Sequence, residues 1–158
     1  MTQPFDVVVV EHGPVVLRVC RALLRGADAD DAWSETFLSA LAAYPNLQHG
    51  SNVRGWLVTI AHRKSLDQIR RRGRHAIPVA VVPDVPTREI VDLSDDELRE
   101  VLARLTERQR RAVIYRHLGD LTYAEIAGLL DCSQDAARRS VADGLANLRK
   151  MYTKGNEK

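Results

Sequence analysis

Three prolines within seventeen residues divide this chain more sharply than any other feature of its sequence. Pro78, Pro83 and Pro86 lie in the segment 76–92, which reads AIPVAVVPDVPTREIVD. Each proline lacks a backbone N–H donor, so a continuous helix through this segment is excluded. An edge strand over residues 79–82 is the alternative, although no second strand is evident for it to pair with. We therefore expect two blocks, residues 1–75 and 93–158, joined by a flexible linker over residues 76–92.

The composition of the chain is that of a globular protein. Hydrophobic residues make up 45% of the 158 residues and charged residues 28%, which excludes a disordered chain. No apolar run approaches the roughly 18 residues that cross a bilayer, and no basic segment precedes an apolar core, so neither membrane insertion nor export is expected. The two cysteines, Cys20 and Cys132, lie far apart and without metal-ligand spacing. This pattern favours a reducing cytoplasm and argues against a disulfide framework or a zinc site.

Apolar residues at helical spacing predict three helices in the first block. The first covers residues 5–24, with a break at Gly13 and Pro14, although the valine run 7–10 alone would suggest a strand. The second covers residues 28–43, where Trp33, Phe37, Leu38 and Leu41 form the apolar pattern. The third runs from about 53 to 72, after a polar loop over residues 48–52.

The third predicted helix carries most of the positive charge of this block. Residues 54–74 hold seven Lys or Arg side chains and one acid, Asp67. On a helical wheel the expected core face consists of Leu57, Val58, Ala61, Leu66 and Ile69, and the opposite face of Trp56, Ile60, Arg63, Asp67, Arg70 and Arg74. A stacking side chain beside a basic stripe suits unpaired nucleic-acid bases. The alternative is that Trp56 belongs to the core and the arginines only keep the helix soluble.

Helix-capping signals organise the second block. The pairs Ser94 and Glu97, Thr106 and Gln109, and Thr122 and Glu125 are three capping boxes, and Ser133 caps a fourth helix, so helices are expected to begin near 94, 106, 122 and 134. The fourth should end near Arg149 and Lys150. The last two helices, separated by a three-residue turn, have the lengths of a helix-turn-helix. Ala127 lies at their expected crossing, with an apolar seam of Ile126, Leu130, Ala137, Val141 and Leu148; a plain helical hairpin is the alternative.

Taken in order, these segments resemble a bacterial RNA polymerase sigma factor of the extracytoplasmic-function type, in the sigma-70 superfamily. Residues 28–38 look like the helix that binds the polymerase clamp. Residues 53–57, Ile60, Ala61 and residues 67–72 look like the promoter-melting helix that reads the −10 element, and residues 44–52 correspond to the loop that holds a flipped-out base. Residues 105–109 and 122–149 look like the domain that binds the −35 element.

The resemblance implies an all-α fold of two small helical domains, the C-terminal one with a helix-turn-helix, and it assigns three sets of residues. Those expected to bind polymerase are Asp31, Ser34, Glu35, Phe37 and Leu38. Those expected to bind −10 DNA are Asn46, Asn52, Trp56, Arg63, Lys64, Asp67, Arg70 and Arg71. Those expected to bind −35 DNA are Thr122, Ser133, Gln134, Ala136, Arg138, Arg139 and Arg149.

The same resemblance implies the partners. They are core RNA polymerase, double-stranded promoter DNA, the single-stranded −10 region and an anti-sigma factor. The chain is expected to act as a monomer in the cytoplasm, without a cofactor or a metal ion.

Three departures from the family pattern stand out. Ser34 replaces a common glutamine, and Arg63 follows His62 where the family often has asparagine after its Ile-Ala pair. The third is the expected recognition helix, which is poor in cations: Ser140, Asp143, Leu145 and Asn147 fill places where the family often has arginines. Because each missing phosphate contact weakens the electrostatic part of binding, we expect the isolated C-terminal block to bind the −35 element weakly.

A catalytic role has little support, because the five histidines are scattered and none has a carboxylate at triad or ligand spacing; they are His12, His49, His62, His75 and His117. Two other functions stay open from the sequence. One is a dimeric helix-turn-helix regulator of palindromic sites, and the other is a sigma-like protein-interaction module that does not read promoters.

Overall fold

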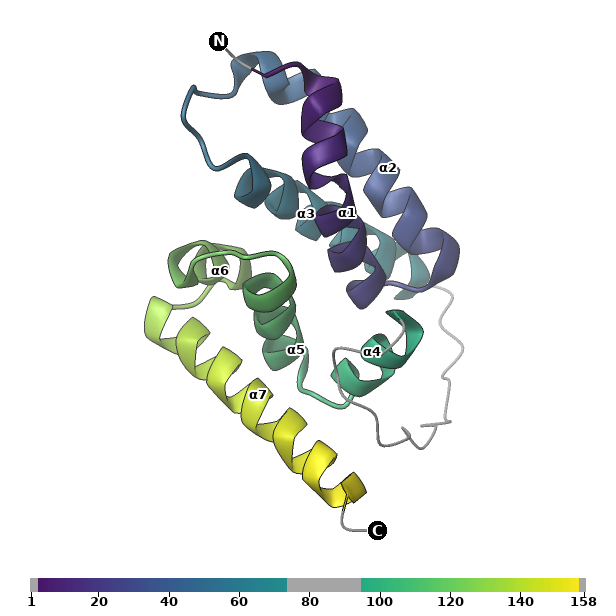
Figure 1. The fold of residues 1–158 in the computed structure, drawn as a ribbon, viewed down its shortest axis with the longest axis vertical. Helices are drawn as coiled ribbons and strands as arrows, with labels where there is room; N and C mark the ends of the chain where they lie inside the picture. The colour runs from purple at the N-terminus through teal and green to yellow at the C-terminus, as the bar shows by residue number, and fades with distance from the viewer. Residues whose placement is uncertain (1–2, 74–94, 157–158) are drawn as a thin grey trace. The chain divides into compact units, whose positions relative to one another are not determined.

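The computed structural model describes residues 3–73 and 95–156, in which every regular element is helical. They form two compact units, the first built from α1, α2 and α3 and the second from α4 to α7 (Figure 1). The linker and its alternative edge strand, the Ser94 cap and the placement of Arg74 and His75 lie outside the described residues.

Helix α1, Phe5–Leu23, runs through Pro14 without interruption, so the expected break is wrong. A proline inside a helix costs about 3 kcal/mol, because it removes one backbone hydrogen bond. Its ring faces solvent here, however, and the opposite side of α1 buries Val8, Val16 and Val19 completely. Since full burial of each such side chain contributes about 1.5–3 kcal/mol, packing outweighs the defect. The valine run 7–10 is helical as well, and Val8 is its fully buried member.

Helix α2, Gly26–Ala43, packs against both α1 and α3. Its buried side is built from Ala29, Ala32, Thr36, Phe37 and Ala40, mostly small residues that let the helices approach closely. The Trp33 indole Nε1 donates to the carbonyl oxygen of Gly13 at 3.0 Å and joins α2 to α1. A short 3₁₀ turn, η1 (Tyr44–Asn46), follows.

Helix α3, Val53–Gly73, buries Leu57, Val58 and Ala61 as predicted. Ser65 and Gln68 are buried as well, because on a helical wheel they fall between these apolar positions. His62 is also buried, which makes it a packing residue. Of the other residues expected in the core, Leu66 lies at the border of the buried arc and Ile69 near the end of the helix, and both are only half-buried.

The second unit contains α4 (Asp95–Leu102), α5 (Glu107–Val113), a π-helical turn η3 (Ile114–Leu118), α6 (Tyr123–Leu130) and α7 (Gln134–Asn156). The capping boxes of α5 and α6 are both present. Ser133 caps α7, its Oγ accepting from the backbone N–H of Ala136 at 3.0 Å. The expected end of α7 near Arg149 is wrong, because Arg149 and Lys150 are good helix formers and no glycine or proline follows before Gly155.

Helices α6 and α7 form the expected helix-turn-helix. Between them lies a three-residue turn in which Asp131 has a left-handed backbone (φ 54°). The seam of Ile126, Ala137, Val141 and Leu148 is buried, whereas Leu130 is half-buried. Helix α7 also packs closely on α5, where a Cβ built on Gly144 would lie 2.7 Å from Val113 Cγ2.

Candidate nucleic-acid interface

The first surface of interest is the solvent-facing side of α2. Asp31, Ser34 and Leu38 are exposed there, Leu38 to 67%. Leu41, three residues further on, is exposed to 53% and belongs to the same apolar strip. Leu41 was predicted only as part of the amphipathic pattern and not as a residue that binds a partner. Its i, i+3 spacing from Leu38, however, places the two side chains next to each other on the helix.

Phe37 does not lie on this surface. It is only 6% exposed, and its ring centroid lies 4.8 Å from that of Trp33 and 6.4 Å from that of Phe5. Its expected place among the residues that face a partner is therefore corrected to a core position. Glu35 is half-buried, and its Oε2 lies 3.7 Å from Nη2 of Arg71 on α3.

The second surface is the basic face of α3. Arg63, Arg70 and Arg71 are exposed, whereas Lys64 and Asp67 are half-buried. Arg70 Nη1 lies 3.9 Å from Asp67 Oδ1. An ion pair this exposed contributes little, so a phosphate can displace the Asp67 carboxylate. The face therefore presents a row of cations to solvent.

Trp56 lies beside this row and is half-buried, which fits neither a fully packed nor a fully exposed side chain. Its ring centroid is 6.4 Å from that of Tyr44, with an angle of 36° between the ring planes. The Tyr44 hydroxyl in turn donates to the carbonyl oxygen of Gln3. Two aromatic rings thus meet at the start of α3, and Trp56 remains partly exposed there.

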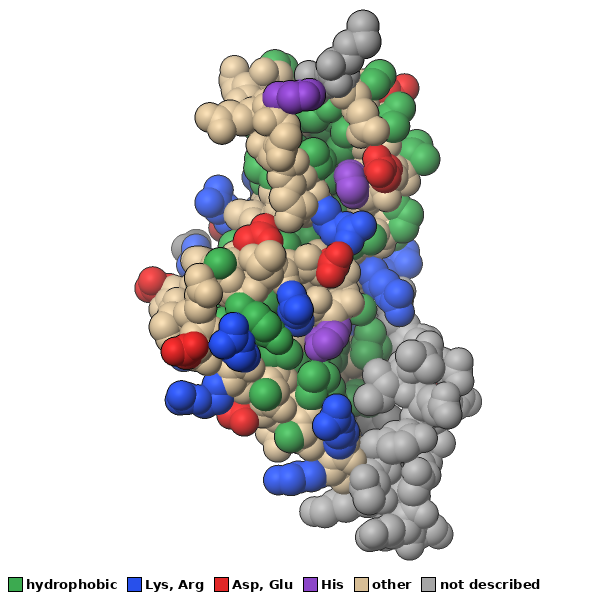
Figure 2. Space-filling view, turned by 60° about the vertical axis from the view of Figure 1, so that its left-hand side comes forward, with side chains coloured by type: hydrophobic (Ala, Val, Ile, Leu, Met, Phe, Trp, Pro, Cys, Tyr) green, Lys and Arg blue, Asp and Glu red, His purple; other side chains and the backbone are tan. Residues whose placement is uncertain are grey.

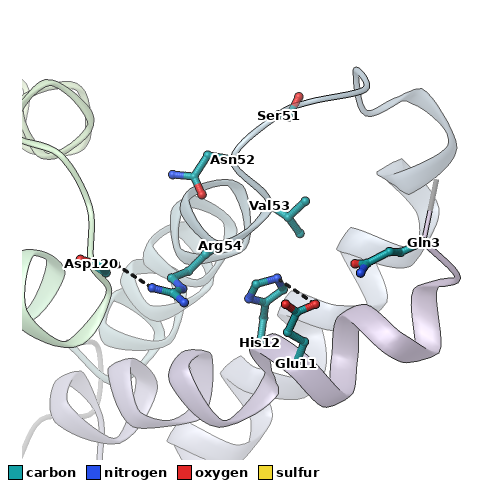
Figure 3. Close-up of a pocket in the computed structure, with 8 residues that line it drawn as sticks. All are labelled: Gln3, Glu11, His12, Ser51, Asn52, Val53, Arg54 and Asp120. Atoms are coloured by element: carbon teal, nitrogen blue, oxygen red, sulfur yellow. Dashed lines mark hydrogen bonds and ion pairs between the residues drawn. The ribbon is translucent and has the colours of Figure 1, made fainter. Parts of the chain in front are cut away.

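A polar hollow adjoins the loop that precedes α3 (Figure 3). Its lining includes Glu11 and His12 from α1 and Ser51, Asn52 and Arg54 from the loop and the start of α3. Asn52 Oδ1 accepts from the backbone N–H of Gly55 at 3.2 Å, which holds this asparagine at the helix start. No hydrogen-bond partner for the buried His12 Nδ1 is found among the described residues. The contribution of α1 was not evident from the sequence, because it depends on tertiary packing. Asn46, in η1, is exposed.

The third surface is the exposed side of the helix-turn-helix. Thr122, Ser133, Gln134, Arg138, Arg139 and Arg149 are exposed, and Ala136 is half-buried. The hydroxyls of Thr122 and Ser133 serve as helix caps, Thr122 Oγ1 accepting from Glu125 N at 3.2 Å. On the face shown in Figure 2, Lys and Arg side chains are interspersed with Asp and Glu side chains and form no uniform basic patch.

Two residues near this surface, Arg116 and Tyr123, were not predicted from the sequence. The Arg138 guanidinium carbon lies 5.1 Å from the centroid of the Tyr123 ring, and that of Arg116 lies 4.5 Å from the same centroid. No local signal could reveal this contact, since Arg116, Tyr123 and Arg138 come from three different elements.

Three further observations concern metal binding, thiol reactivity and membrane insertion among the described residues. No group of three or more His, Cys, Asp or Glu side chains among them is placed to hold a metal ion. The Cys20 thiol is buried, and this burial raises its pKa to about 12, so it is a poor nucleophile. None of the helices in the described ranges is both long enough and apolar enough to span a bilayer.

A three-helix unit with an exposed basic face, followed by a helix-turn-helix unit, is an arrangement typical of helical DNA-binding proteins. Two family models match the chain in that order: Sigma-70 region 2 over residues 8–75 and Sigma-70, region 4 over residues 95–148. The chain belongs to the sigma-70 family of RNA polymerase sigma factors, in its extracytoplasmic-function group.

Curated relatives agree with this assignment. The chain is 36% identical over 121 residues to the extracytoplasmic-function sigma factor SigC of Mycobacterium tuberculosis, a match that covers 72% of this chain and 64% of SigC. It is 30% identical over 154 residues to the sigma factor CarQ of Myxococcus xanthus, covering 93% of this chain and 88% of CarQ. The match thus spans less than two thirds of SigC, and 53% of SigK of Mycolicibacterium vanbaalenii.

A solved structure shows the same fold. The sigma factor RpoE of Bartonella quintana, crystallised with the anti-sigma factor NepR, superposes with a TM-score of 0.79 at 22% identity. The superposition covers 94% of this chain and 96% of RpoE.

Proposed function

We propose that this chain is an alternative sigma factor, which binds core RNA polymerase and directs it to a particular set of promoters without catalysing a reaction itself. The observation that carries the proposal is the basic face of α3, where Arg63, Arg70 and Arg71 lie exposed beside the half-buried Trp56. This arrangement occurs within the part that matches Sigma-70 region 2, and a helix-turn-helix follows it in the chain.

The exposed strip of α2 is the proposed polymerase-binding surface. Leu38 and Leu41 supply exposed apolar area, and Asp31 and Ser34 lie on the same helix as polar neighbours. An apolar centre with a charged rim is the usual composition of a protein interface. Glu35 contributes through its ion pair with Arg71, and Phe37 supports the helix from the core.

The basic face of α3 is the proposed site for the unpaired −10 strand. Single-stranded DNA is bound by cations that follow the phosphates and by aromatic rings on which bases stack. The exposed arginines and Lys64 supply the cations and Trp56 the ring, with Asp67 interspersed among them. Unstacking a base costs a few kcal/mol, so a site for the extruded base helps to keep the strands apart. The hollow beside Asn52 and His12, with Asn46 nearby in the chain, is our candidate for that site.

The helix-turn-helix is the proposed −35 reader. Gln134 and Ala136 lie in the first turn of α7, from which side chains of a recognition helix reach base edges. Arg138, Arg139 and Arg149 supply phosphate contacts, and the capped positions Thr122 and Ser133 fix the helix starts that face the groove. With so few cations, we expect this unit to bind DNA weakly by itself.

Residues 1–75 would then act on polymerase and the −10 element, residues 93–158 on the −35 element, and residues 76–92 would connect them. Two structurally similar proteins were solved in complexes, the sigma factor RpoE with the anti-sigma factor NepR and CnrH with the cytosolic domain of CnrY. We propose that this chain, too, is held by an anti-sigma factor, and that it works as a monomer in the cytoplasm.

Run-off transcription tests the proposal. Purified core polymerase is mixed with the chain and a library of promoter fragments, and new transcripts are sequenced. Defined start sites that require the chain are the expected result. Co-elution with polymerase without transcripts would instead identify an interaction module, and binding of a palindromic duplex by a dimer without polymerase would identify a conventional regulator.

A further inference from the structure

A tyrosine beside the helix-turn-helix touches two arginines. The guanidinium carbons of Arg116 and Arg138 lie 4.5 Å and 5.1 Å from the centroid of the Tyr123 ring. These distances are within the range of about 6 Å over which a cation is attracted to an aromatic face. The two guanidinium carbons are therefore held within about 10 Å of one another.

The backbone around Tyr123 is held by a capping box. Tyr123 is the first residue of α6, directly after Thr122, whose side chain and that of Glu125 complete a capping box. Thr122 N donates to Glu125 Oε1 at 3.0 Å, and Glu125 N donates to Thr122 Oγ1 at 3.2 Å. Because these reciprocal bonds hold the first turn of α6, the Tyr123 side chain projects from a well-ordered helix start.

Arg116 reaches the ring from the π-helical turn η3. Such turns are rare in proteins, and those that occur are often found at functional sites. Arg116 Nη1 also donates to the carbonyl oxygen of Leu121 at 2.9 Å. This bond uses one of the five N–H donors of a guanidinium, so the group can still bind an anion.

Arg138 reaches the same ring from α7. Its side chain is 60% exposed, and its Nη1 lies 3.7 Å from Asp135 Oδ1. A pair this exposed and this long is weak, so the contact with Tyr123 is the more specific constraint on where the guanidinium lies. Arg138 is thus exposed to a ligand and also held in place.

We propose that Tyr123 is a positioning residue for DNA binding: its ring holds Arg116 and Arg138 as a pair that binds the backbone phosphates of the duplex. The inference rests on the proposed function of the helix-turn-helix and extends it to two residues outside α7. Pre-ordering of two long side chains lowers the entropy lost on binding. This matters most in a recognition helix that offers few other cations.

The test uses the full chain and a short fluorescent DNA duplex of mixed sequence, titrated over a range of salt concentrations. The main variant is Tyr123→Leu, which removes the ring but keeps an apolar side chain, and its counterpart is Tyr123→Phe, which keeps the ring. Both changes are repeated in a chain carrying Arg116→Gln and Arg138→Gln. A second background, Arg139→Gln, removes an exposed cation of α7 for which no contact with the Tyr123 ring is found among the described residues.

We expect Tyr123→Leu to weaken duplex binding about three- to tenfold at low salt and Tyr123→Phe to bind within about twofold of the unchanged chain. The slope of log affinity against log salt should become shallower for Tyr123→Leu, by up to about 0.9 for each phosphate that is no longer neutralised. The decisive expectation is that Tyr123→Leu has no further effect once both arginines are glutamine, but keeps its full effect in the Arg139→Gln background.

Two results would overturn the inference and leave the proposed function intact. One is duplex binding by the unchanged chain that Tyr123→Leu does not alter. The other is an equal loss in the double-glutamine background, which would mean that Tyr123 acts through folding or through its own contact with DNA. A chain that shows no salt-dependent duplex binding at all would overturn the proposed DNA-binding function together with the inference.

Discussion

Replacing Gly144 by alanine should destabilise the second unit, although alanine is the better helix former. A Cβ at this position would lie 2.7 Å from Val113 Cγ2 and 3.4 Å from the carbonyl oxygen of Gln109. Carbon atoms normally approach to about 3.5–4.0 Å, so the valine methyl would have to move by about 1 Å. Val113 is only 6% exposed, and its β-branched side chain has little rotamer freedom. The strain must therefore pass into the packing of α5 against α7.

The expected change in the free energy of unfolding of Gly144→Ala is the balance of two opposing effects. Overpacking a well-filled core costs about 1–3 kcal/mol, whereas glycine to alanine in a helix gains about 1 kcal/mol. We expect the free energy of unfolding to fall by about 1 kcal/mol. With a denaturant dependence of about 2 kcal/mol per molar urea, the unfolding midpoint should fall by about 0.5 M.

Gly128 provides the matched control within the same unit. It lies exposed in α6, and among the described residues no heavy atom beyond its chain neighbours and its own helix backbone comes within 4 Å of a Cβ built there. Gly128→Ala should therefore raise the free energy of unfolding by up to about 1 kcal/mol. The two variants have the same composition, so a difference between them reports local packing.

Urea unfolding followed by far-ultraviolet circular dichroism compares the two variants, and amide hydrogen exchange of α5 and α7 localises the change. Both tryptophans, Trp33 and Trp56, belong to the first unit, so tryptophan fluorescence monitors the part of the chain that is left unaltered. If Gly144→Ala proved as stabilising as Gly128→Ala, the argument from close helix approach would be refuted.

Three further predictions concern a cap, a surface and a buried thiol. Thr122→Ala removes the cap of α6 and should lower the free energy of unfolding by about 1 kcal/mol in urea titrations, and an unchanged midpoint would contradict the role of the capping box. Phe37→Ala should cost about 3–5 kcal/mol because it empties part of the core, whereas Leu38→Ala should change stability by less than about 0.5 kcal/mol and weaken co-elution with core polymerase. Undiminished co-elution of Leu38→Ala would remove that residue from the proposed surface. Burial raises the pKa of Cys20 from 9.0 to about 12, so between these values the folded chain keeps a proton that the unfolded chain loses. The free energy of unfolding should thus fall by up to about 1.4 kcal/mol per pH unit above about pH 9, and Cys20→Ala should lack this component; equal pH slopes for the two chains would contradict it.

Local signals in the sequence predicted the helix starts of the second unit well. The caps at Thr106, Thr122 and Ser133 were all confirmed, because a capping bond joins residues only three apart. The all-α fold and the helix-turn-helix follow from these starts and from the spacing of apolar residues. Helix ends were less predictable, since α7 continues well past Arg149 where no residue stops it.

Features that depend on distant packing were not predictable. Burial on the far side of α1 tolerates Pro14, and the packing of α2 against its neighbours turns Phe37 inward while Leu38 stays exposed. The same limit applies to the candidate site. Arg138 was predicted from its place in the recognition helix, but its partners Tyr123 and Arg116 come from other elements and are recognised only in the folded chain.

Capture of unpaired promoter bases by the α3 face, as proposed above, can be followed through the opening of the promoter strands. A promoter fragment that supports run-off transcription is labelled with 2-aminopurine in its −10 region, and its fluorescence is followed after addition of core polymerase and the chain. We expect a rise in fluorescence that requires the chain and that is reduced by Trp56→Ala and, at moderate salt, by Arg63→Gln. Unchanged fluorescence with the unaltered chain, or full opening by a chain that carries both substitutions, would contradict it.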